Sequence, residues 1–109
     1  MAKKAIEIAS DKQATDIVLL DVREICTFAD YFVICNGQSE RQIKVLSREI
    51  DKVLSQVGAV LLRQEGTVDS GWILMDFSDV IVHVFGTQER DYYQLDRLWG
   101  AATPLLHIQ

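Results

Sequence analysis

Two aspartates and a histidine in the second half of the chain are the side chains best suited to chemistry. Asp76 and Asp79 flank the dipeptide Phe77-Ser78, and His83 follows four positions later. Two carboxylates can ligate a divalent cation, and a histidine within hydrogen-bond reach of a carboxylate can act as a general acid or base. A separation of three across a turn, however, is typical of solvated turn aspartates. On an extended strand Asp79 would lie too far along the chain to touch His83, so the spacing favours neither catalytic use.

A second candidate site is the segment Asn36-Gly37-Gln38-Ser39, which joins a predicted strand to a predicted helix. The N-terminus of a helix can hold a phosphate group, but the glycine-rich phosphate-binding patterns are missing from the sequence. Ser39 and Gln42 instead have the spacing of a capping box, in which each side chain binds a backbone N–H at the start of the helix. The segment therefore predicts a turn and a capped helix.

The cysteines and histidines do not have the spacing of a metal site. Cys26 and Cys35 lie among apolar or β-prone residues and form no Cys-x-x-Cys pair, which favours reduced, buried thiols. His83 and His107 are far apart, and neither has a cysteine or second histidine at ligand spacing. The sequence therefore predicts no metal and no cofactor.

The charge of the chain bears on its partner. Eleven basic and sixteen acidic residues give a formal net charge of −5. Binding through phosphates requires clustered basic side chains, but here the basic residues of one predicted helix are mixed with acidic ones: Arg41, Lys44, Arg48 and Lys52 with Glu40, Glu49 and Asp51. This pattern argues against direct, sequence-specific nucleic-acid binding and favours a basic protein surface as the partner.

Nothing in the sequence predicts a membrane protein. No apolar run approaches the ~20 residues that a spanning helix needs. Lys3 and Lys4 near the start are not followed by the apolar stretch of a signal peptide, because Asp11 and Lys12 interrupt the segment. We therefore expect a cytoplasmic protein.

The order of the predicted elements indicates one α/β (α+β) domain over residues 1–109, with a mixed β-sheet of about five strands and helices packed on it. A weak helical stripe covers the first dozen residues. Apolar or β-branched runs predict strands, and apolar residues at spacings of three and four predict helices. The predicted strands are 16–22, 31–35, 60–62, 72–77 and 80–85; the later helices are 40–57, ended by Gly58, and 89–101; residues 65–71 are predicted to be a loop.

The last two predicted strands form a hairpin with two unlike faces. If Phe77-Ser78 is the turn, Trp72 pairs with His83, Leu74 with Ile81 and Asp76 with Asp79, and all six side chains share one face. The other face, with Ile73 and Val82, is purely apolar and belongs against the helices. The mixed face suits contact with a partner, and the pattern predicts a surface position for His83. The alternative is that Trp72 only covers the edge of the sheet.

At this hairpin the chain resembles the Iojap and ribosomal-silencing-factor family. The similarity runs from about residue 5 to residue 102, and its individual motifs gain specificity from their order and from the length of the chain. The motifs are Ala29-Asp30-Tyr31-Phe32-Val33-Ile34, Gly37-x-Ser39-x-Arg41-Gln42, Glu65-Gly66, Trp72-Ile73-Leu74-x-Asp76, Asp79-Val80-Ile81-Val82-His83-Val84-Phe85, Glu89-Arg90 and Tyr93-x-Leu95-x-x-Leu98-Trp99.

The resemblance implies a nucleotidyltransferase-like topology without the catalytic residues. It also implies a non-enzymatic repressor of translation that binds the large ribosomal subunit through universal large-subunit ribosomal protein fourteen and blocks the small subunit. A homodimer in the free state is a further implication. Carried onto this sequence, the partner-binding residues are Trp72, Leu74, Asp76, Ile81, His83, Arg90 and Tyr93.

Three departures from the family pattern and two alternatives accompany this interpretation. Phe77-Ser78, Asp96 and Gly100 stand where other residues are usual in the family, and the first of these departures falls at the predicted turn. The main alternative is a nucleotidyltransferase-like enzyme or nucleotide-binding domain. Such enzymes use a closely spaced Asp-x-Asp on a strand, however, and a shared fold does not carry function with it. The other alternative is an interaction module unrelated to ribosomes.

Overall fold

The computed structural model describes the backbone of residues 1–93 and 102–108, with side chains for residues 1–90 and 102–108. Its elements follow in the order α1 (Ala2–Asp11), β1 (Thr15–Asp21), β2 (Tyr31–Gly37), α2 (Glu40–Gln56), β3 (Arg63–Thr67), β4 (Trp72–Asp76), β5 (Val80–Gly86), α3 (Thr87–Tyr93) and β6 (Thr103–Ile108).

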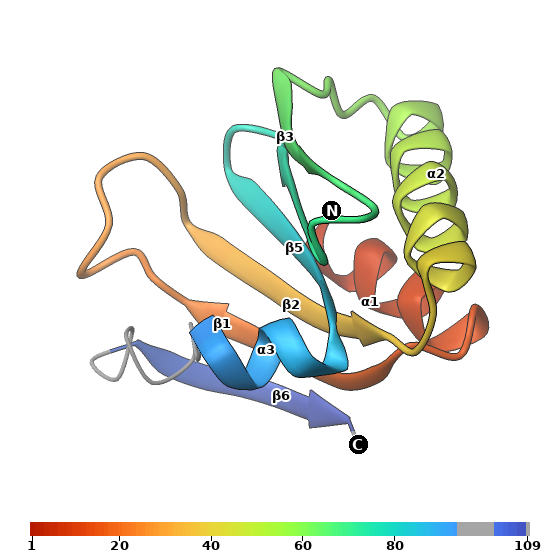
Figure 1. Ribbon diagram of the computed structural model, residues 1–109. Helices are drawn as coiled ribbons and strands as arrows, with labels where there is room; N and C mark the ends of the chain where they lie inside the picture. Colours follow the sequence, from red (N-terminus) through yellow and green to blue (C-terminus); the bar gives the residue numbers. More distant parts are fainter. Residues whose placement is uncertain (94–101, 109) are drawn as a thin grey trace.

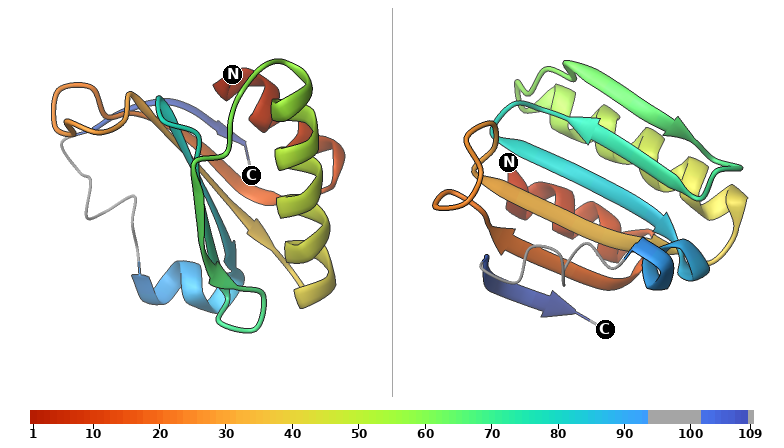
Figure 2. Two further views of the ribbon diagram at one scale, coloured as in Figure 1. Left: turned by 90° about the horizontal axis from the view of Figure 1, so that it is seen from above. Right: turned by 60° about the vertical axis from the view of Figure 1, so that its left-hand side comes forward.

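The described strands form one mixed sheet in the order β3-β4-β5-β2-β1-β6 (Figure 1). β2 and β5 run parallel, and every other neighbouring pair is antiparallel. Helices α1 and α2 lie side by side on one face of this sheet, whereas α3 lies on the opposite side (Figure 2). The predicted mixed α/β fold class is therefore confirmed, with six strands rather than about five.

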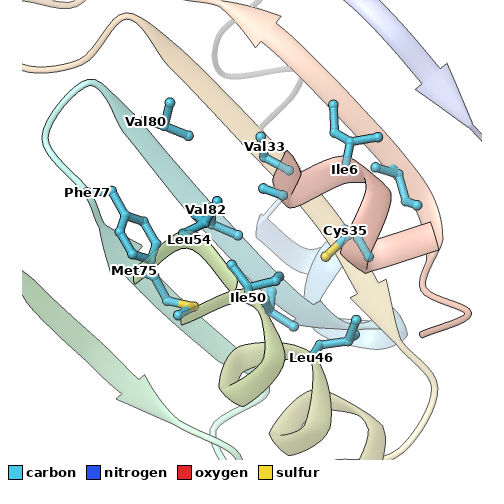
Figure 3. Packing of buried hydrophobic residues seen from close by; sticks show 14 of the residues in the cluster. Ile6, Val33, Cys35, Leu46, Ile50, Leu54, Met75, Phe77, Val80 and Val82 are labelled. Carbon is cyan, nitrogen blue, oxygen red and sulfur yellow. The ribbon is translucent and has the colours of Figure 1, made fainter. Parts of the chain in front are cut away.

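The main core fills the space between the sheet and helices α1 and α2 (Figure 3). α2 contributes Ile43, Leu46, Ile50 and Leu54, all buried and spaced by three or four residues as one helical face requires. These side chains meet the apolar face of the hairpin, which includes Met75 and Val82. The face predicted to pack against the helices is thus the one that does.

The start of α2 is capped largely as the sequence predicts. The Ser39 hydroxyl accepts the backbone N–H of Gln42 at 3.1 Å. The Gln42 side chain, however, does not reach back to Ser39. Its Oε1 accepts the N–H of Gln38 at 2.6 Å, and its amide nitrogen donates to the carbonyls of Lys12 and Gln13. Gln42 therefore also joins α2 to the segment that follows α1.

A second cluster of buried side chains lies on the opposite face of the sheet. It includes Val18, Phe32, Ile34, Ile81 and Phe85 and continues into the loop between β1 and β2. The central strands are thus buried on both faces. The predicted buried thiols are confirmed: both cysteines are buried and free, and burial raises the pKa of Cys35 to about 12.

Two predicted elements are wrong. Residues 60–62 precede a strand instead of forming one, and β3 occupies much of the predicted loop at 65–71. β3 is an edge strand whose residues are all exposed, so it needs no apolar side chains.

The strand β6 was not predicted, because Pro104 is allowed only in an edge strand or at a bulge. Of the predicted helix 89–101, the structure shows helix to residue 93, and residues 94–101 lie outside the described part.

The hairpin register differs from the predicted one by two residues. Trp72 pairs with Phe85, Leu74 with His83 and Asp76 with Ile81, because the turn lies one residue later, around Ser78 and Asp79. Asp76 and Asp79 therefore do not face each other as a pair. A shift of two preserves the alternation of side chains, so the division of the hairpin into two faces still holds.

Candidate functional site

An accessible surface forms where β3 and β4 pair. Side chains of directly paired residues project to the same side of an antiparallel pair, and the pairs here are Arg63 with Asp76, Glu65 with Leu74 and Thr67 with Trp72. The three residues on β3 are exposed, and those on β4 are half-buried. We call this surface the β3–β4 face; it consists of Arg63, Glu65, Thr67, Trp72, Leu74 and Asp76.

The charged side chains of the β3–β4 face form a small network. Arg63 pairs with Glu65 at 3.2 Å and lies 3.6 Å from the Asp76 carboxylate. Asp76 also accepts the backbone N–H of Ser78 at 2.8 Å, which fixes its carboxylate at the hairpin turn. Arg63 and Glu65 are mostly exposed, and ion pairs of this kind contribute little to stability. Both side chains are therefore free to rearrange toward a partner at low cost.

A hollow of about 210 Å³ lies within this face, lined by Glu65, Gly66, Ser70, Trp72 and Leu74. Gly66 makes the close approach of the two strands possible. Its φ is +86°, and a Cβ at this position would lie 2.0 Å from the carbonyl oxygen of Trp72. Only glycine fits such a position. The hollow is thus framed by an indole ring, a leucine and one carboxylate.

Trp72 is held from two directions. Its indole N–H donates to Nδ1 of His83 at 3.2 Å. Its ring stacks on Phe85, with centroids 5.1 Å apart and planes inclined by 25°. Part of Trp72 remains accessible, since the residue is only half-buried. Trp72, which the sequence predicts as a contact residue, is therefore held in one orientation and remains accessible to a partner.

His83 does not occupy the predicted surface position, and this expectation is wrong. It is 3% exposed, because β5 is a central strand covered on both faces. Its ring packs against Phe32 at a centroid distance of 4.9 Å. Burial, and to a smaller extent the charge of Arg90, lowers the pKa of His83 to about 3. The imidazole is neutral at physiological pH and cannot touch a partner directly.

Ile81 and Arg90 are likewise interior. Ile81 is 2% exposed within the second cluster. The Arg90 guanidinium donates to the carbonyl of Asp16 and to Oδ1 of Asn36, each at 2.9 Å, and approaches the Asp16 carboxylate at 3.4 Å. Arg90 therefore ties α3 to the ends of β1 and β2. Contact by Ile81 or His83 would require the sheet to open, and contact by Arg90 would require its guanidinium to leave Asp16 and Asn36. Among the predicted contact residues whose side chains are described, only Trp72, Leu74 and Asp76 on β4 are accessible.

The side chain of Tyr93, the last predicted contact residue, lies outside the described part. Sequence reasoning also missed Arg63, Glu65 and Thr67, which the structure adds beside Asp76, Leu74 and Trp72. Their segment, Arg63–Thr67, carries no apolar alternation from which a strand could be predicted.

The other candidate site is a hollow of about 340 Å³ at the carboxyl ends of the parallel strands β2 and β5. Glu40, Asp69 and Glu89 line it, and its lining residues, all within the described part, include no lysine or arginine. The backbone N–H of Gln38 there is bound by the Gln42 side chain. These features oppose a phosphate. Moreover, no three histidine, cysteine or acidic side chains of the described residues gather as a metal site would require.

Comparison with known proteins gives a consistent result. Residues 1–109 match the family model described as ribosomal silencing factor during starvation. The chain is 43% identical over 100 residues to ribosomal silencing factor RsfS of Bacillus subtilis, covering 92% of this chain and 85% of that protein. It is 42% identical over 98 residues to RsfS of Halalkalibacterium halodurans, covering 90% and 84%. A crystal structure of a Chromobacterium violaceum protein superposes with a TM-score of 0.87, at 34% identity and with 91% and 82% coverage.

Proposed function

Because this chain belongs to the family of ribosomal silencing factors, we propose that it represses translation by binding the large ribosomal subunit and preventing the small subunit from joining. The β3–β4 face carries this proposal. It is the surface on which a tryptophan is both fixed and accessible, next to a hollow and two adaptable charged side chains. Aromatic residues set beside such hollows are frequent hot spots of protein interfaces.

The partner on the large subunit is proposed to be universal large-subunit ribosomal protein fourteen, as the family resemblance implies. Charge supports a protein partner of basic character. The chain carries a net charge of −5, and Glu65 and Asp76 on the β3–β4 face outnumber its one cation, Arg63. Opposite charge accelerates encounter with a basic surface and fixes the orientation of docking.

Inhibition of subunit joining is proposed to be steric. The described fold has a Cα radius of gyration of 12.4 Å, and its smallest extent is 23 Å. A body of this thickness on the joining surface would hold the two subunits apart. An interface of roughly 800 Å² on each partner is typical of specific complexes, so one face of this small protein offers enough area.

We propose that binding alone accounts for this activity, without catalysis. The acidic lining of the strand-end hollow supports this view, since it opposes the phosphates of a nucleotide. Asp76 is engaged by Arg63 and by the Ser78 N–H, as expected of a turn aspartate. With a ribosomal partner, the proposed location of the protein is the cytoplasm. The homodimer in the free state stays a prediction from the resemblance.

Sedimentation with separated ribosomal subunits tests the binding step. The purified protein should migrate with the large subunit only, and Trp72→Ala should weaken this binding by at least ~2 kcal/mol, about thirtyfold. Phe28→Ala is the matched control, because Phe28 is an aromatic side chain, 62% exposed, in the loop between β1 and β2. A Trp72→Ala protein that stays folded and binds as tightly as the Phe28→Ala protein would exclude the β3–β4 face as the binding surface.

A further inference from the structure

Within the proposed function, on which this inference rests, we propose that buried His83 is the positioning residue of the β3–β4 face. Its Nδ1 atom accepts the indole N–H of Trp72 at 3.2 Å and thereby fixes the orientation in which Trp72 meets the ribosomal partner. His83 thus acts through Trp72 and makes no contact with the partner itself.

The first argument is the geometry of the pair. Trp72 pairs across the ladder with Phe85, and Leu74 pairs with His83, so His83 is the diagonal neighbour of Trp72 on the same face. Diagonal neighbours lie within reach of long aromatic side chains. Phe85 supports the flat side of the indole, and His83 holds its polar edge. Stacking alone would permit two orientations of the indole, related by a half-turn about its Cβ–Cγ bond, whereas the hydrogen bond selects the one that points the N–H at His83.

The second argument is the protonation state that this bond requires. The indole nitrogen can only donate a hydrogen bond, so Nδ1 of His83 must lack a proton. The neutral imidazole then carries its proton on Nε2. Burial among Phe32, Phe85 and Trp72 keeps the ring neutral. The environment therefore maintains the tautomer that can hold Trp72.

The third argument is that His83 costs the fold stability. Its Nε2 atom is buried and has no hydrogen-bond partner among the described residues. A buried donor without an acceptor is unfavourable, and an apolar side chain of similar size at this position would avoid the penalty. Packing therefore does not account for a histidine here. The bond to Trp72 is the interaction that a leucine or phenylalanine at position 83 could not make.

Positioning of this kind affects affinity because a side chain that is already ordered loses less freedom on binding. Loss of the hydrogen bond should therefore weaken binding to the large subunit by about three- to tenfold. The effect should be smaller than that of removing the indole itself, since the ring and its stacking on Phe85 remain. It should also depend on the presence of the indole N–H.

The test compares three substitutions on β5. His83→Leu removes the acceptor, and His83→Asn retains one, because the Asn amide oxygen is bonded to Cγ as Nδ1 is. Val82→Ala is the control: Val82 is buried on the opposite face of the same strand, so it perturbs the core without touching Trp72. The readouts are the NMR signal and hydrogen exchange of the Trp72 indole N–H, assigned by its loss in Trp72→Phe, and the affinity for isolated large subunits.

We expect His83→Leu to speed exchange of the Trp72 indole N–H and to weaken binding three- to tenfold, and His83→Asn to restore both. In Val82→Ala both should match the original protein. Trp72→Phe removes the donor, so His83→Leu should add no further loss of affinity in that background. If His83→Leu does not fold, the comparison uses Trp72→Phe and His83→Asn alone. His83→Asn should then keep the indole exchange rate and the affinity of the original protein, whereas Trp72→Phe, which lacks the donor, should bind more weakly.

Two outcomes would overturn the inference while leaving the proposed function intact. One is a folded His83→Leu protein that binds as tightly as the original. The other is a Val82→Ala protein that loses as much affinity as His83→Leu, since binding would then follow stability alone. If the original protein itself fails to bind large subunits, the proposed function falls, and the partner role of His83 with it.

Discussion

The stability of the fold should decrease as the pH drops below about 6.5, and His83 should account for a defined part of the decrease. In the unfolded chain the imidazole has an ordinary pKa of about 6.5. In the folded protein, burial and then the charge of Arg90 lower the pKa of His83 to about 3. Between these two values the unfolded chain binds a proton that the folded protein does not. Protonation therefore favours the unfolded state, and stability is lost as the pH falls.

The size of this effect follows from the two pKa values. At about pH 8 the imidazole is neutral in both states, so the contribution is close to zero. At about pH 5 proton binding favours the unfolded state by ~2 kcal/mol. This free-energy difference depends little on the pKa of His83 in the folded protein, provided that this pKa lies well below 5. For a chain of this size it corresponds to a decrease in melting temperature on the order of 10 °C.

Urea unfolding of the original protein and of His83→Asn, at about pH 8 and pH 5, isolates this contribution. Asparagine does not titrate, so the variant should lose ~2 kcal/mol less between the two pH values. His107→Gln is the control, because His107 is the other histidine and its side chain is 46% exposed. If His83→Asn and the original protein show the same pH dependence, His83 is not buried as a neutral imidazole, and the argument for its tautomer fails.

Three further substitutions test the packing and the local structure. Val82→Ala and Ile73→Ala should each lower the free energy of unfolding by about 1–4 kcal/mol, because both side chains are buried against the helices. Calorimetric melting of each variant checks this prediction. An unchanged melting temperature would show that these residues are assigned to the wrong face of the hairpin. Ser39→Ala should lower it by ~1 kcal/mol, since the hydroxyl that accepts the Gln42 N–H is lost; a threonine at position 39 should preserve most of the stability.

The hairpin shows why a sequence can predict a face without predicting a register. Side chains alternate with a period of two, so the predicted division between Trp72 and Ile73 survives a shift of two residues. The turn itself could not be placed, because Phe77-Ser78 lacks the residues that specify a two-residue turn. Ser78 has a φ of +76°, a conformation that its residue type does not predict.

The strands at the two edges were beyond prediction for a physical reason. Edge strands need neither an apolar face nor an uninterrupted ladder of backbone donors. β3 could therefore be polar throughout, and β6 could contain Pro104 at an irregularity in its pairing with β1. Because the sequence did not predict β3, it also did not predict that Arg63, Glu65 and Thr67 form half of the candidate surface.

The burial of His83 could have been predicted from its neighbours. Residues 80–85 form a continuous apolar run apart from this histidine, a pattern typical of a strand covered on both faces. The alternation of side chains along the hairpin, taken alone, predicts His83 on the accessible face with Trp72. Arg90 offered no comparable signal, because its partners Asp16 and Asn36 come from distant parts of the chain.

A subunit-joining assay tests the central claim most directly. Large subunits are incubated with the protein, small subunits are added at a magnesium concentration that favours joining, and light scattering follows the formation of joined ribosomes. The original protein and Phe28→Ala should both reduce joining in proportion to the large subunits they occupy, and Trp72→Ala should not. Full joining while the original protein stays bound to the large subunit would contradict the steric account.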